Sequence, residues 1–187
     1  MKFLNISSVI NFFSETSTYF DAKAVMNEGF ENLLKLCSRQ LKEKQISLYI
    51  TTSVLYKLKQ FSESEDFETS NIAKTRLAEI EVLTQEGIIK CIGNPNHKCP
   101  ASQQLVKYAI KYRSHKQLAF ITNSKSLSHD LLMQNELRSY NGHHIYVFNI
   151  SKKGFLFDCE ENEIDESNKN TSESIGNNNF LNLFGLN

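Results

Sequence analysis

The stretch LAFITNSKSLSHDLL, residues 118–132, decides the fold of this 187-residue chain. Its first five residues, Leu118–Thr122, are apolar except for the last and predict a buried strand. A short polar turn follows, and the pattern continues as a helix over residues 126–135. A buried strand that leads through a polar turn into a helix is the unit from which parallel sheets are built.

Similar units lie on both sides of this stretch. Strands are predicted at Lys2–Ile6, Leu48–Ile50, Ile88–Ile92 and His144–Asn149, with a short edge strand at Phe155–Phe157. Helices are predicted over residues 23–44, from Thr52 or Ser53 to about Phe61, over 71–86 with Gly87 as a stop, and over 101–114. Strands that alternate with helices predict an α/β fold with a central parallel sheet covered on both faces.

Ligands of such sheets bind at the carboxyl ends of the strands, so the segments around those ends carry the functional information. Four of them are KFLNISSVINFF (2–13), LYITTSVLYKL (48–58), ASQQLVKYAIKY (101–112) and residues 118–132. In order and spacing they resemble the four motifs of the PIN-domain family, most of whose members are metal-dependent ribonucleases. The resemblance covers residues 1–155 and implies a PIN-like three-layer fold, a central parallel sheet flanked by helices.

This sequence departs from the family pattern at the acidic positions. The resemblance places the family's four acidic residues at Asn5, Lys57, Ser102 and Ser124. A slip of one residue at the second or third motif changes nothing, because the neighbours Tyr56, Ala101 and Gln103 are not acidic either.

These replacements bear directly on metal chemistry. Mg²⁺ and Mn²⁺ are held by carboxylates, which activate water for phosphodiester hydrolysis. Three neutral side chains and one ammonium group repel a divalent cation, so we expect no catalytic residue, no metal and no cofactor. The expected function is a non-catalytic RNA-binding or scaffolding subunit, in RNA metabolism or in a defence or toxin–antitoxin type of system.

Two alternatives stay open. One is an active metal-dependent endoribonuclease, using Mg²⁺ or Mn²⁺, whose site is rebuilt from acids such as Glu15 or Asp130 or completed by a partner chain. The other is a protein-interaction adaptor that binds no nucleic acid.

A basic stretch supports contact with nucleic acid. Residues 87–129 contain no acidic residue, and His97, His115, Tyr108 and Tyr112 are interspersed among the bases. Cations next to aromatic rings suit phosphate contact and base stacking. The candidate nucleic-acid contacts are Lys98, Lys107, Lys111, Arg113, Lys116 and Lys125.

The cysteines and histidines give weaker signals. Cys91, His97 and Cys99 offer three zinc ligands, but the C-x₂-C spacing of common structural sites is absent. Cys91 falls on an apolar strand, where a core position is expected. The four cysteines are expected to be free thiols in a reducing compartment. His143 and His144 follow an Asn-Gly turn and are expected in an exposed loop.

The chain divides by composition into three parts. Residues 158–187 hold seven acids and one base, so residues 1–157 hold 14 acids and 20 bases of the 21 of each sign. We expect a PIN-like domain over 1–157, an acidic Asn/Ser-rich disordered linker over 158–179 and an apolar docking motif over 180–187. The motif contains Phe180, Leu181, Leu183, Phe184 and Leu186, and it is expected to bind a protein partner.

No apolar run is long enough to span a membrane, and the first residues lack the pattern of a signal peptide. The expected location is the cytoplasm, with the nucleus open for a eukaryotic chain.

Overall fold

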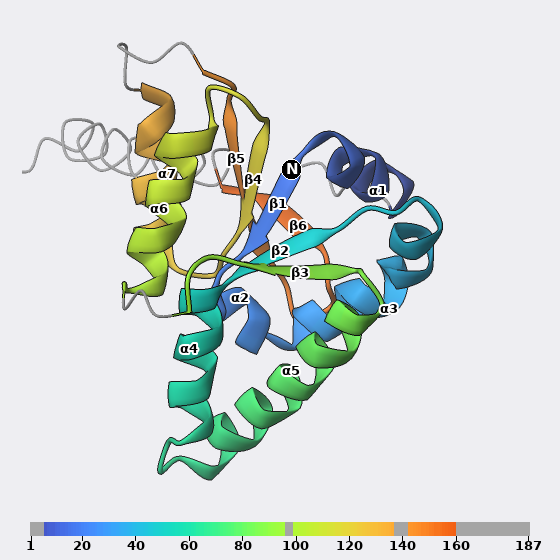
Figure 1. The fold of residues 1–187 in the computed structure, drawn as a ribbon, viewed down its shortest axis with the longest axis vertical. Coiled ribbons are helices and arrows are strands. Elements are labelled where there is room, and N and C mark those ends of the chain that lie inside the picture. The colour runs from blue at the N-terminus through green and yellow to red at the C-terminus, as the bar shows by residue number, and fades with distance from the viewer. Residues whose placement is uncertain (1–5, 96–98, 137–141, 160–187) are drawn as a thin grey trace, which may run out of the picture.

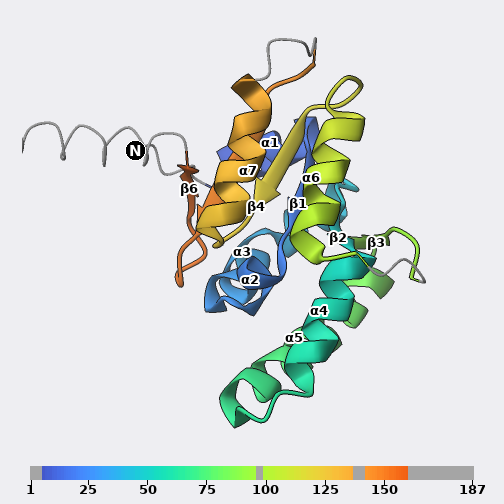
Figure 2. The same ribbon diagram turned by 90° about the vertical axis from the view of Figure 1, so that its left-hand side faces the viewer.

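The computed structural model describes residues 6–95, 99–136 and 142–159, which form a layered α/β fold (Figures 1 and 2). Its six-stranded sheet has the order β3-β2-β1-β4-β5-β6. The first five strands in that order pair in parallel, and β6 runs antiparallel to β5. The strands are β1 Ser17–Phe20, β2 Leu48–Thr51, β3 Ile89–Ile92, β4 Leu118–Ile121, β5 Ile145–Ile150 and β6 Leu156–Asp158. The α/β class with a mostly parallel central sheet flanked by helices is therefore confirmed.

The helices cover both faces of the sheet. They are α1 Ile6–Glu15, α2 Ala22–Met26, α3 Glu28–Glu43, α4 Thr52–Ser62, α5 Phe67–Gln85, α6 Ala101–Tyr112 and α7 Lys125–Glu136. Figures 1 and 2 show α6 and α7 on one face and α1, α3 and α5 on the other. Right-handed crossovers explain this, because the chain moves outward from β1 to β3 and then returns to β4 and β5.

The structure describes Ile6 of the strand expected at Lys2–Ile6, and there the prediction is wrong, because Ile6 begins helix α1. The buried residues of α1, Val9, Ile10 and Phe13, are spaced for one helix face. The central strand is instead β1, a four-residue segment of sequence STYF. Its Thr, Tyr and Phe residues favour strands, but four residues are too few to show a clear period.

Two helix boundaries differ from the predicted ones. The helix expected over residues 23–44 is two helices, because Asn27 has an extended backbone and its side chain accepts a hydrogen bond from the Gly29 N–H. Helix α5 begins at Phe67, four residues earlier than predicted, because the Asp66 carboxylate caps it through the Thr69 N–H at 2.9 Å. Both caps are local side-chain contacts of the type favoured at helix starts.

The core lies between the sheet and both helix layers. Phe20 of β1 and Phe30 of α3 are fully buried on the α3 side, with their rings edge to face at 5.2 Å between centroids. On the α6 side the Tyr19 ring stacks on Phe120 of β4, with 5.3 Å between the ring centroids. The described fold extends to Cys159, whose side chain is buried beside Ser128 of α7.

Several predicted features lie outside the described residues. These are Asn5, His97, Lys98, most of the acidic linker and the apolar motif with Phe180, Leu181, Leu183, Phe184 and Leu186. Within the described part of the chain, no helix combines the length and the apolar character that crossing a membrane requires.

Close packing of α3 against the β5–β6 turn gives a stability prediction. A Cβ atom at Gly29 would overlap the backbone carbonyl of Ser151. We expect Gly29→Ala to lower the free energy of unfolding by about 3 kcal/mol. Gly87→Ala is the control: its φ of +76° strains an L residue, but nothing lies within 4 Å of a new Cβ. It should cost only about 1 kcal/mol. Urea unfolding of both variants measures the difference, and equal losses would contradict this account of the α3 contact.

Candidate functional site

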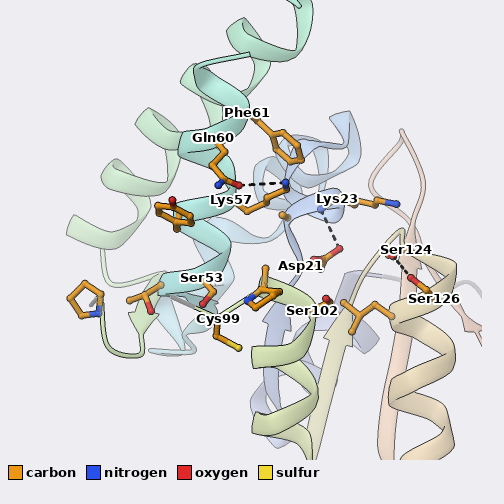
Figure 3. Close-up of a pocket in the computed structure, with 17 residues that line it drawn as sticks. Asp21, Lys23, Ser53, Lys57, Gln60, Phe61, Cys99, Ser102, Ser124 and Ser126 are labelled. Carbon is orange, nitrogen blue, oxygen red and sulfur yellow. Dashed lines mark hydrogen bonds between the residues drawn. The ribbon is translucent and has the colours of Figure 1, made fainter. Parts of the chain in front are cut away.

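The carboxyl ends of the central strands surround a cavity of about 590 Å³, which we name the strand-end pocket (Figure 3). Its walls come from the starts of α2, α4, α6 and α7 and from the segment after β3. The lining residues are Asp21, Ala22, Lys23, Thr52, Ser53, Tyr56, Lys57, Gln60, Phe61, Pro95, Cys99, Pro100, Ala101, Ser102, Ser124, Ser126 and Leu127.

Three of the four residues at the family's acidic positions line this one pocket. Lys57 comes from α4, Ser102 from the first turn of α6 and Ser124 from the turn before α7. They are far apart in the sequence, and the parallel sheet brings them together because the three segments follow strands that end at the same edge. The two other acids considered for a rebuilt site, Glu15 and Asp130, do not line it.

The expectation that the strand ends carry no carboxylate is wrong, because Asp21 follows β1 directly and lines the pocket. Its side chain is 6% exposed and accepts hydrogen bonds from the Thr122 hydroxyl at 3.0 Å and the Lys23 N–H at 3.2 Å. The second of these bonds caps α2. The sequence signal was available: three strand-forming residues, Thr18–Phe20, precede an Asp at an N-cap position.

Burial raises the pKa of the Asp21 carboxyl above its ordinary value. The hydrogen bond from Thr122, the backbone N–H groups and the charge of Lys23 act in the opposite direction and are smaller. A carboxyl in a cleft with a raised pKa is the kind of group found at functional sites.

Ser53 contributes a polar group without a partner. Its residue is 4% exposed, and among the described residues its hydroxyl oxygen has no hydrogen-bond partner. Its backbone N–H is used, since it donates to the Gln104 side chain at 3.2 Å. A buried polar atom without a partner calls for an explanation, and because Ser53 lines the pocket we take its hydroxyl as a candidate ligand contact.

The pocket is electrostatically suited to an anion. Helices α4, α6 and α7 begin at it, and each N-terminus carries a partial positive charge. The N-cap of α6 is Pro100, and no side chain caps this helix. Two exposed cations, Lys23 and Lys57, stand at the rim. The Lys57 ammonium lies 3.4 Å from the Gln60 side-chain oxygen and 4.8 Å from the centre of the Phe61 ring.

The described residues contain no group of three or more His, Cys, Asp or Glu side chains that could hold a metal ion. Cys91 is exposed, not in the core as expected, and its sulfur lies 3.7 Å from the Thr84 hydroxyl of α5. Cys99 lines the strand-end pocket, with the Lys107 ammonium 3.8 Å from its sulfur. Cys37, Cys91, Cys99 and Cys159 all lie in the described part of the chain, and none of them forms a disulfide bond.

The predicted basic residues do not form one patch. Lys107 and Lys111 are exposed on α6, and Lys125 is exposed at the start of α7. Lys116 lies at the other end of the sheet, in a hollow that also involves His115, His143 and Lys44.

Arg113 is not a surface residue. It is 5% exposed, and its guanidinium donates to the backbone carbonyl of Gln134 in α7. This places Arg113 as a link between α6 and α7, so we leave it out of the nucleic-acid contacts.

Comparison of the sequence with protein-family models gives no match, and comparison with curated proteins gives none either.

The buried carboxyl of Asp21 predicts a pH-dependent stability. Because its pKa is raised in the folded state, folding stability falls as the pH rises from the ordinary Asp pKa through the raised one. Asp21→Asn removes this loss and keeps an oxygen for the Lys23 N–H and the Thr122 hydroxyl. We expect a higher melting temperature for the variant at about pH 7, with the advantage shrinking as the pH is lowered towards about 4.

Asp66→Asn is the matched control. The Asp66 carboxylate is exposed, and hydrogen bonds from Thr69 hold its pKa below the ordinary value. Its stabilising effect is therefore present above the ordinary pKa and lost as the pH falls. Asp66→Asn should lower the melting temperature at about pH 7, and the loss should shrink on acidification. The same sign for both variants would contradict the burial argument for Asp21.

Proposed function

We propose that this chain is a degenerate member of the PIN-domain family that binds single-stranded RNA and does not cleave it. The observation that carries the proposal is the meeting of Asp21, Lys57, Ser102 and Ser124 in one pocket at the carboxyl ends of the parallel strands. Asp21 takes the place of the first-motif aspartate, and the other three positions hold an ammonium group and two hydroxyls.

The composition of the pocket favours a phosphate group over a divalent cation. One buried carboxylate is too few to hold Mg²⁺ or Mn²⁺ beside two lysines, since each cation site of this kind needs several anionic oxygens. The N-termini of three helices, two ammonium groups and several hydroxyls instead provide donors for a phosphate oxygen. A phosphodiester held there has no metal-bound water to attack it.

The surroundings of the pocket support a polyanion as the ligand. Residues 44–62 and 87–129, which supply β2, α4, β3, α6, β4 and the start of α7, contain no acid. Residues 63–86, which form the α4–α5 turn and α5, contain seven. RNA attracted by this field would meet the α6 side of the sheet and the strand-end pocket first.

The salt dependence of RNA binding tests whether the strand-end pocket holds the phosphate. We expect a labelled single-stranded RNA of about ten nucleotides to bind, with a log–log salt slope of about −2 to −3 for three or four phosphate contacts at ~0.7 each. Lys23→Gln with Lys57→Gln should reduce the slope by about 1.4. Lys74→Gln, an exposed lysine of α5, should leave it unchanged.

Ser53→Ala separates a ligand contact from a structural one. The hydroxyl makes no hydrogen bond within the described chain, so its removal should leave the melting temperature unchanged. Affinity for RNA should fall about fivefold, the value of one hydrogen bond. A variant that binds RNA as tightly as the unmodified chain would remove Ser53 from the site. Absence of RNA binding by the unmodified chain would favour the adaptor alternative.

Restoring the acidic positions tests the family assignment. Lys57→Glu, Ser102→Asp and Ser124→Asp together would add three carboxyl groups to that of Asp21, so the pocket would hold four. We expect the triple variant to bind Mn²⁺ in calorimetry and the unmodified chain to give no signal, because the cluster needs several carboxylates. Addition of Asp21→Asn should weaken the acquired site. If the triple variant folds and binds no Mn²⁺, the four positions do not form the family's metal site.

An active nuclease is the second candidate function, because Asp21 supplies one carboxylate for a metal site that a partner chain would complete. Its signature is RNA cleavage by the unmodified chain with Mg²⁺ or Mn²⁺, abolished by EDTA and by Asp21→Asn. We expect no cleavage by the chain alone.

A further inference from the structure

Four tyrosines form a stacked series that runs from the sheet onto α6, and we name it the tyrosine ladder: Tyr49, Tyr19, Tyr108 and Tyr112. The ring centroids are 5.3 Å apart for Tyr49 and Tyr19, 6.0 Å for Tyr19 and Tyr108, and 5.5 Å for Tyr108 and Tyr112. The interplanar angles are 27°, 23° and 18°, so the rings are nearly parallel.

The ladder is only partly covered. Tyr19 is buried at its centre, whereas Tyr49, Tyr108 and Tyr112 are half-buried. Tyr49 pairs in register with Lys90 of β3, the edge strand, and Lys90 is exposed. Because Lys90 is exposed and Tyr49 is half-buried beside it, solvent reaches this part of the β2–β3 strand pair.

Cations border the ladder, and one acid, Glu15, lines the same hollow as Tyr49. The Lys111 ammonium lies 5.1 Å from the centre of the Tyr112 ring. Lys107 is exposed one turn earlier on the same helix, and Lys90 lies beside Tyr49 across the strand pair. The ladder thus combines half-open aromatic rings with positive charge, the chemistry of surfaces that bind single-stranded nucleic acid.

The ladder adjoins the strand-end pocket. Gly93, the residue after β3, is packed so that a Cβ there would come within 2.6 Å of the Thr52 hydroxyl and 3.4 Å of the Tyr108 hydroxyl. Thr52 lines the pocket. Helix α6 links the two places, because its first turn lines the pocket and its later turns carry Tyr108 and Tyr112.

We infer that the two end rings of the tyrosine ladder, Tyr49 and Tyr112, stack bases of the same single-stranded RNA whose phosphate the strand-end pocket holds. The inner rings, Tyr19 and Tyr108, stack on their neighbours in the series. The inference rests on the proposed function and adds base recognition to phosphate binding. Stacking tolerates any base because each has an aromatic face, so the ladder gives affinity for single strands without choice of sequence. A duplex does not offer these faces, since its bases are stacked on one another.

The experiment compares a single-stranded RNA of about ten nucleotides with an abasic strand of the same length and charge. The chain has seven tyrosines, of which four form the ladder, and no tryptophan. Tyr56 lines the strand-end pocket, so the change in tyrosine fluorescence that belongs to the ladder is the part lost in the Tyr49→Leu and Tyr112→Leu variants. We expect the RNA to quench the tyrosine fluorescence and to bind about a hundredfold more tightly than the abasic strand, about tenfold for each of two stacked bases. Equal affinity of the two strands, or equal quenching, would overturn the inference while leaving the phosphate site intact.

Single-residue variants test whether the preference for RNA over the abasic strand comes from the tyrosine ladder. Tyr112→Leu and Tyr49→Leu should each weaken RNA binding about tenfold and leave binding of the abasic strand unchanged. Lys23→Gln with Lys57→Gln should weaken both strands equally. Phe67→Leu, at a residue 78% exposed at the start of α5, is the control and should change neither. If the Tyr49→Leu and Tyr112→Leu variants still prefer RNA to the abasic strand as strongly as the unmodified chain does, the inference is overturned. If neither strand binds the unmodified chain, the proposed function is overturned instead.

Discussion

One buried hydrogen bond, from the Thr122 hydroxyl to the Asp21 carboxylate, joins the carboxyl ends of the two central strands. Strands β1 and β4 are neighbours, and the direction of strand order reverses between them. The chain leaves β1 for the α2–α3 side and leaves β4 for α7 on the opposite face, so a crevice opens there. The same two residues also order the turns that follow, because Asp21 caps α2 and the Thr122 hydroxyl accepts from the Ser124 N–H. The positions of the pocket walls formed by α2 and α7 depend on this junction.

The separation of charge gives the fold two different sides. The α4–α5 turn and α5 carry the acids, and α5 is held to α3 by Arg76, whose guanidinium bonds Glu31 and Glu79 at 3.0 and 2.6 Å. The segments that form the strand-end pocket and the tyrosine ladder lack acids almost entirely, and Asp21 is the carboxylate that the pocket contains. Phosphate binding and base stacking are proposed for the same side because the positive field and the open aromatic rings coincide there.

Sequence reasoning succeeded where the pattern was long. The strand and helix of residues 118–132, the helix of residues 101–114 and the positions Lys57, Ser102 and Ser124 at the strand ends all have counterparts in the structure. It failed at β1, because the apolar residues at the chain start suggested a strand, although Ile6 begins a helix. Because the first strand was expected at Lys2–Ile6, Asn5 was assigned to its end, and Asp21, which follows β1, was missed. Arg113 was misplaced for another reason: charge in the sequence does not reveal that a guanidinium is buried against a helix end.

The sequence by itself determined the alternation of strands and helices, the absence of acids from residues 87–129 and the absence of carboxylates at Lys57, Ser102 and Ser124. These are properties of composition and period, which each segment carries alone. Only the tertiary structure decided that Asp21 lines one pocket with those three residues, that the Ser53 hydroxyl at this pocket has no partner among the described residues and that four tyrosines from β1, β2 and α6 stack in one series. Such contacts depend on which strands are neighbours, and strand order is fixed by packing over the whole sheet.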